Sequence, residues 1–197
     1  GDRSGIFSDY PMAPDHVRVG DHNLWAFTIS ESEDLPTELS TTRRVESLSG
    51  SSSELFLSLG AAIGPLLDTE HIVNQYILTV PQTEVLSELD SRKRRMQSMS
   101  RSADNRLGAQ EIEEFVDEVH RESSTSVMAH TNILVWGDDN AHLEVKGKIS
   151  SALAGMGVTC VEDTVDTPVL WYAGIPGASC EIGAENLMLM ELHSALC

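Results

Sequence analysis

The fold is decided by Asn23-Leu24-Trp25-Ala26-Phe27-Thr28-Ile29-Ser30, the most strand-prone stretch of the chain. Successive side chains of a strand point to opposite sides, so Leu24, Ala26 and Thr28 share one face, and Trp25, Phe27 and Ile29 share the other. Trp25, Phe27, Thr28 and Ile29 are aromatic or β-branched, as is common in strands. The stretch therefore predicts a β-strand, and the rest of the chain is interpreted around it.

Further strands are predicted by similar patterns, over Glu54–Gly60, Ile72–Val80 and Val127–Trp136. A short helix is expected to begin at Asp34-Leu35-Pro36, with Asp34 as its cap. A long helical section follows Pro81, from about Thr83 to Ala103. After a break at Gly108, the spacing of four apolar residues predicts an amphipathic helix, through Ile112, Phe115, Val116 and Val119. The resulting order β-α-β-β-α-α-β is typical of a ferredoxin-like α+β fold, a mixed or antiparallel sheet with helices on one face.

An extra helix-strand unit is expected to extend this sheet. Asp138 or Asp139 is predicted to cap the next helix, which would end at Gly155 or Gly157. Its buried face is predicted to hold Val145, Ile149, Ala152, Leu153 and Met156. Short strands are predicted over Val158–Val161 and Val169–Ala173, and a final helix over Ala184–Cys197. We therefore expect an irregular lead-in over residues 1–20 and a single α+β domain over residues 21–197, cut from a larger protein.

The composition favours an acidic folded domain. Hydrophobic residues make up 41% of the 197 residues, enough for a core, and the formal net charge is −18. Such a surface repels phosphate backbones, so direct DNA binding is not expected, whereas a basic partner is compatible; acidity that only aids solubility is the alternative. The three scattered cysteines, Cys160, Cys180 and Cys197, indicate reduced thiols in a cytoplasmic compartment.

Searches for catalytic motifs give little. The Gly147-Lys148 pair lies in a helical pattern and lacks the hydroxyl residue and the upstream glycine of a phosphate-binding loop. The usual zinc spacings and the Gly-x-Ser-x-Gly elbow do not occur. A hydrolase that uses Cys180 or a histidine–carboxylate pair is the weakest interpretation. We therefore expect no catalytic residues, no metal and no cofactor in this fragment.

One basic segment departs from the acidic background. Six of the 13 Lys and Arg residues fall within 15 positions, as Arg92, Lys93, Arg94, Arg95, Arg101 and Arg106. One interpretation is a docking site for an acidic partner or for anionic lipid headgroups. The other is a solvated helix face that pairs with the acidic helix from Glu111 to Glu122.

A second candidate surface is apolar. The turn at Ile175 and Pro176 and the predicted terminal helix, with Leu187, Met188 and Met190, are expected to form an exposed patch on which another domain packs.

Several stretches, taken in order, resemble one family. They are Asp21-His22-Asn23-Leu24, leading to Asp34-Leu35-Pro36; His71-Ile72-Val73-Asn74-Gln75-Tyr76; Arg94-Arg95-Met96-Gln97-Ser98-Met99-Ser100-Arg101; and Val165-Asp166-Thr167-Pro168-Val169-Leu170-Trp171-Tyr172-Ala173-Gly174-Ile175-Pro176-Gly177. Over about residues 17–197 the chain resembles the region that precedes the nucleotide-binding loop in the conjugative-transposon TraG family of type IV secretion ATPases.

The resemblance implies a parent ATPase that uses ATP and Mg²⁺, with its catalytic residues beyond residue 197. It implies a hexamer at the cytoplasmic face of the inner membrane, which reaches the membrane through its partners. This fragment would be a non-catalytic docking domain that contacts secretion-channel proteins, neighbouring subunits or its own ATPase domain during DNA transfer. The alternative is a nucleic-acid-binding module that uses the segment from Arg92 to Arg106.

Overall fold

The computed structural model describes residues 12–29, 31, 34–36, 42–46, 52–56, 67–99, 103–122 and 125–196. The contacts divide the chain into two compact units, where the sequence predicted one domain over residues 21–197. Unit 1 comprises residues 1–76, 130–188 and 197, and unit 2 comprises residues 77–129 and 189–196.

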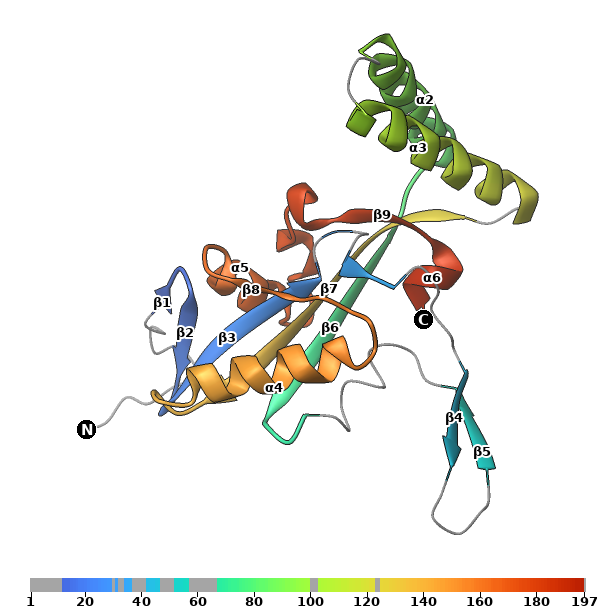
Figure 1. The fold of residues 1–197 in the computed structure, drawn as a ribbon. Helices are drawn as coiled ribbons and strands as arrows, with labels where there is room; N and C mark the ends of the chain where they lie inside the picture. The colour runs from blue at the N-terminus through green and yellow to red at the C-terminus, as the bar shows by residue number, and fades with distance from the viewer. Residues whose placement is uncertain are drawn as a thin grey trace. The chain divides into compact units, whose positions relative to one another are not determined.

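Seven of the described strands form one sheet (Figure 1). Its main strands lie in the order β1-β2-β3-β7-β6, while β8 pairs with β3 and β9 pairs with β7. Their bounds are β1 Met12–Ala13, β2 His16–Val19, β3 His22–Ile29, β6 His71–Thr79, β7 Ser126–Gly137, β8 Val161–Asp163 and β9 Met188–Glu191.

The quoted stretch forms β3, which pairs on both edges. Along one edge, residues 23–29 run antiparallel to β7, with Asn23 opposite Gly137 and Ile29 opposite Thr131. The other edge is shared, because β2 pairs with residues 22–24 and β8 pairs with residues 26–28, both antiparallel. The predicted α+β class with a largely antiparallel sheet is therefore confirmed.

Two helices of unit 1 use opposite faces of β3. The helix α4, His142–Ala154, buries Val145, Ile149 and Leu153 as predicted, and Trp25 and Val145 both lie next to Gly137. The helix α5, Thr167–Ala173, packs Leu170 and Ala173 with Leu24, Ala26 and Leu134 in one buried cluster. Because alternate residues of a strand face opposite ways, α4 covers the Trp25 face, and α5 covers the Leu24 face.

The α5 segment corrects a predicted strand over Val169–Ala173. Asp163 turns the chain before the helix, because its carboxylate accepts backbone N–H bonds from Val165 at 2.9 Å and Asp166 at 2.6 Å. The Thr167 hydroxyl donates to the carbonyl of Asp163 at 2.9 Å. Pro168 then sits in the first turn, where proline favours a helix.

Three other expectations of unit 1 differ from the structure. Residues 12–19 of the expected irregular lead-in form β1 and β2, because Val17 pairs with Leu24 and is fully buried. Asp138 and Asp139 do not cap α4, since Asp138 pairs with His22 at 3.0 Å and Asp139 pairs with Arg18 at 2.8 Å. The predicted strand over Val158–Val161 begins only at Val161.

A separate hairpin of two strands also belongs to unit 1, made by β4 Thr42–Glu46 and β5 Ser52–Phe56. The sequence predicted a loop over Ser49–Ser53, but Ser52 and Ser53 are in β5. The predicted strand Glu54–Gly60 matches β5 only as far as Phe56, and residues 57–60 lie outside the described part. Residues 34–36 form no α-helix, and residues 37–41 of the predicted short helix also lie outside it.

Unit 2 consists largely of two long helices, α2 Gln82–Ser98 and α3 Ala103–Glu122, which contact each other. Both helices were predicted, but the break at Gly108 was wrong. Gly108 lies inside α3, where a Cβ atom would meet the end of the Met96 side chain at 3.2 Å. The glycine therefore serves the close approach of two helices and ends neither of them.

The expected terminal helix over Ala184–Cys197 is also corrected. The segment contains a short 3-10 turn, Ala184–Asn186, then β9, then a short helix α6, Leu192–Leu196. β9 pairs with β7, so pairing with the sheet overrides the helical pattern. In the described part of the chain, no helix has the length and hydropathy needed to cross a membrane.

Candidate interaction surfaces

The predicted basic segment lies on the α2–α3 hairpin. Arg92, Lys93, Arg94 and Arg95 are in the second half of α2, and Arg106 is near the start of α3. All but Lys93 are exposed. Arg101 lies outside the described residues. The structure therefore gathers the described basic side chains at the end of the hairpin where α2 finishes and α3 begins.

Two of these cations have acidic partners within the hairpin. Lys93 Nζ lies 3.0 Å from Glu113 Oε1 on α3, and Arg94 Nη2 lies 2.6 Å from Asp90 Oδ2, four residues earlier on α2. Within the described residues, Arg92, Arg95 and Arg106 form no ion pair. Exposed pairs of this kind contribute at most about 1 kcal/mol each. The expected pairing of the segment with the acidic helix is thus realised by Lys93, while Arg92 and Arg95 present free charge.

The hairpin carries a groove between its helices. One hollow of about 290 Å³ is lined by residues of both helices, namely Leu86, Asp90, Lys93, Ile112, Glu113, Val116, Asp117 and His120. A second hollow adjoins it at Glu113 and is lined by Gln97, Arg106, Ala109, Gln110 and Glu113. Three apolar residues line the first hollow and one, Ala109, lines the second, while the other lining residues are polar or charged. No sequence motif indicated these hollows.

An apolar surface lies on and around α5. Four large side chains are exposed there: Val165 at 72%, Val169 at 40%, Tyr172 at 53% and Ile175 at 43%. Val169 and Tyr172 are three residues apart on the helix and therefore neighbours on its outer face. Together with the exposed Pro176, these residues form what we call the α5 stripe.

The α5 stripe matches only part of the predicted patch. Ile175 and Pro176 belong to it, as expected. Leu187 is half-buried against the core of unit 1, Met188 is buried, and Met190 packs against Val127 and Ala129 in unit 2. These three residues are therefore core residues, because the segment that carries two of them is a paired strand. Val165, Val169 and Tyr172 were missed because the sequence predicted a strand where α5 forms.

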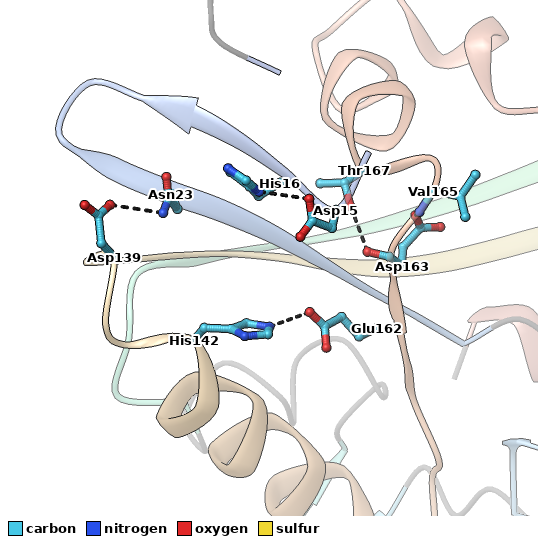
Figure 2. Close-up of polar contacts among 9 residues, drawn as sticks. All are labelled: Asp15, His16, Asn23, Asp139, His142, Glu162, Asp163, Val165 and Thr167. Atoms are coloured by element: carbon cyan, nitrogen blue, oxygen red, sulfur yellow. Dashed lines mark hydrogen bonds and ion pairs between the residues drawn. The ribbon is translucent and has the colours of Figure 1, made fainter. Parts of the chain in front are cut away.

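A histidine–carboxylate pair connects α4 to β8 (Figure 2). Glu162 lies between His142 Nε2, which contacts Oε1, and Lys146 Nζ, which donates to Oε2 at 2.8 Å. His142 also lies against the Trp25 ring, with ring centroids 5.1 Å apart. Burial raises the pKa of Glu162, but the hydrogen bonds from Lys146 and His142 outweigh burial and hold this pKa below its usual value.

The contacts of this pair are those of a structural link. Nucleophilic catalysis places a hydroxyl or thiol within hydrogen-bond reach of the base, whereas His142 Nε2 contacts the carboxylate of Glu162. Cys180 is exposed, and Cys160 is half-buried with a pKa raised mainly by burial. The described residues also contain no cluster of metal-ligating side chains. The pair is best understood as a link between two elements.

A buried polar group lies on the α5 side of the sheet. The Asn74 side-chain amide donates to Asn132 Oδ1 at 3.0 Å, and the Tyr76 and His130 rings are 5.8 Å apart. His130 Nδ1 must donate to the carbonyl of Asn186, at 2.8 Å, because a carbonyl only accepts. Burial is the main cause that lowers the pKa of His130, so this imidazole is neutral near neutral pH.

No model of a protein family matches the chain, and no curated protein matches it.

Proposed function

We propose that this chain is a non-catalytic assembly and docking domain of a type IV secretion ATPase of the TraG type. It would contact channel components or neighbouring subunits while DNA is transferred between bacteria. The proposal rests on the resemblance of four ordered sequence stretches, one of which, Val165–Gly177, includes α5 and the whole α5 stripe.

The α5 stripe is the observation that carries the docking role. Val169 and Tyr172 of the stripe lie on a short helix whose other face, with Leu170 and Ala173, is already buried in the core. An exposed group of apolar residues next to a rigid core is typical of a surface that another protein covers. The same stretch thus carries both the resemblance and the exposed surface.

The parent's ATP and Mg²⁺ would be held outside this fragment, by the nucleotide-binding loop that follows in the family. The partner of the stripe would be the ATPase domain of the same protein, since the corresponding family segment precedes that domain.

The test measures binding between this chain and the parent's ATPase domain, prepared as a separate protein. Replacing Val169 and Tyr172 by Asp is expected to weaken binding about tenfold or more, because two charges would be buried in the contact. Leu143→Asp is the matched control: Leu143 is also an exposed apolar residue of unit 1, on α4, and its replacement should leave binding unchanged.

Calorimetry with ATP and Mg²⁺ supplies an independent readout. Titration of the fragment alone with ATP and Mg²⁺ is expected to give no heat of binding. A micromolar affinity of the fragment for ATP would contradict the proposal that it is non-catalytic. Equal binding by the Val169/Tyr172 variant and the unmodified chain would contradict the role of the stripe.

A further inference from the structure

The α2–α3 hairpin leaves its apolar interior only partly covered. The structure buries no residue of α2, and four apolar side chains of this helix are half-buried, namely Val85, Leu86, Leu89 and Met96. On α3, Ile112, Phe115 and Val116 are also half-buried. Two amphipathic helices alone present more apolar surface than they can bury against each other.

The uncovered surface is a groove that continues along one side of the hairpin. Its two hollows share Glu113, and apolar residues of both hollows form its floor, namely Leu86, Ala109, Ile112 and Val116. The groove runs from the level of Leu86 and His120 to the level of Gln97 and Arg106. Because residue 86 lies beside residue 120 and residue 97 beside residue 106, the two helices are antiparallel.

Charge along this groove is opposite at its two ends. Arg106 lines one end, and Asp117 lines the other. They are eleven residues apart on α3, which is about three helical turns or about 16 Å, so they lie on the same side of the helix. Both are exposed, and neither forms an ion pair within the described residues.

The wider hairpin repeats this arrangement. Arg92, Arg94 and Arg95 lie toward the basic end, whereas exposed carboxylates cluster toward the other end, as Glu84, Glu88, Glu114 and Glu118. The separation is incomplete, because Asp104 lies at the basic end and Arg121 at the acidic end. Large apolar side chains are also exposed at the basic end, at Met99 and Leu107. A surface that is basic at one end and acidic at the other complements a copy of itself turned end to end.

We propose that the α2–α3 hairpin docks onto the hairpin of a second copy of this chain, groove to groove and antiparallel. The four helices form a bundle in which Leu86, Ile112 and Val116 of both copies are covered. The two-fold axis passes near the middle of the groove, so Arg106 of each copy lies opposite Asp117 of the other. This contact is independent of the α5 stripe and of any partner that the stripe binds.

Charge reversal tests the pairing in the full chain. Arg106→Glu places two acidic pairs across the two-fold axis, and Asp117→Arg places two basic pairs there. Either single variant is expected to raise the dissociation constant for self-association about tenfold or more, measured by sedimentation equilibrium at low salt. The combined variant, Arg106→Glu with Asp117→Arg, restores two opposite-charge pairs and should recover self-association.

A mixture of the two single variants provides the most specific test of the pairing. Each variant repels itself, but one of each restores both opposite-charge pairs, so the mixture should form a heterodimer where the separate samples stay largely monomeric. Glu181→Arg is the matched control, since it makes the same change of charge as Asp117→Arg at an exposed carboxylate of unit 1, outside the hairpin. It should leave self-association close to that of the unmodified chain. Circular dichroism checks that each variant is folded.

Two outcomes would overturn the proposal. One is that the unmodified chain stays monomeric up to high concentration at low salt. The groove would then not be a contact between copies of this chain. The other is self-association that neither single reversal weakens, or that the mixture does not restore.

Discussion

Glu162 illustrates how a single residue joins two elements. Its carboxylate is mostly shielded from water, with a side chain that is 8% exposed, yet its pKa lies below the ordinary value of 4.5. His142 and Lys146, four residues apart on α4, face the same way and reach both carboxylate oxygens. The short strand β8 is thereby held to α4 as well as to β3.

Replacing Glu162 by Gln is expected to lower the free energy of unfolding by about 1–3 kcal/mol near neutral pH, because the charged acceptor is lost. The sign of the pH dependence follows from the lowered pKa. The stabilisation is complete above the unfolded value near 4.5 and is lost as the pH falls through the lower folded value. Urea unfolding at about pH 7 and at about pH 3 measures this difference.

Glu144→Gln is the control for that experiment. Glu144 is also on α4 and pairs with Lys148, but its side chain is exposed, so little change is expected. An equal loss of stability at both pH values for Glu162→Gln would show that packing, and not charge, explains its effect.

At the scale of elements, a glycine inside a helix has different consequences in α3 and in α4. Gly108 accommodates Met96 at close range, whereas no atom lies within 4 Å of a Cβ placed at Gly147. Alanine is favoured over glycine in a helix interior by about 1 kcal/mol. Only at Gly108 does a contact oppose this preference.

Gly147→Ala is therefore expected to stabilise the protein by about 1 kcal/mol, measured by urea unfolding. Gly108→Ala should give a smaller gain, about 0.5 kcal/mol or less, because the end of Met96 must move to admit the new methyl group. A larger gain at Gly108 than at Gly147 would contradict the close helix contact.

The same elements show what sequence patterns can predict. The long strands β3, β6 and β7 and the helices α2, α3 and α4 were predicted because their periodicity extends over eight residues or more. The segments Val169–Ala173 and Ala184–Cys197 were not, since a short apolar run fits either a helix or a strand. The hydrogen bonds of Asp163 favour the helix at Val169–Ala173. Pairing of β9 with β7 favours a strand within Ala184–Cys197.

The candidate surfaces were predictable to a similar degree. Composition revealed the basic segment, and the spacing of Asp90 and Arg94 on one helix favours their ion pair, but the pairing of Lys93 with Glu113 follows only from the way the two helices pack. Ile175 and Pro176 were expected to be exposed, whereas the rest of the α5 stripe depends on which face of α5 the core covers. The groove of the hairpin depends on two helices at once, so no single stretch of sequence indicates it.

At the scale of the whole molecule, the net charge favours a protein partner over a nucleic acid. The formal net charge is −18, and only 5% of the residues are aromatic. A nucleic-acid-binding surface would need free cations together with stacking platforms, and two of the basic side chains on α2 are already paired.

We therefore expect no binding of single-stranded DNA by the full chain at about 0.15 M salt, measured by fluorescence anisotropy. The experiment is repeated at low salt with an Arg92→Glu/Arg95→Glu variant. Salt-dependent binding that this variant loses would favour the nucleic-acid-binding module over the docking domain.

The connection between β6 and β7 has a consequence for the architecture. The Glu70 carbonyl accepts a backbone hydrogen bond from Trp136 at 3.0 Å, and at the other end the Gln82 side chain bonds to the backbone N–H and the hydroxyl of Ser126. The two strands are thus adjacent and oppositely directed, and a tight turn of two residues could join them. The α2–α3 hairpin is therefore a long insertion between two strands that a short turn would be enough to connect. Such an insertion can vary in length and sequence without altering strand pairing elsewhere, so it can evolve new contacts while the sheet is kept.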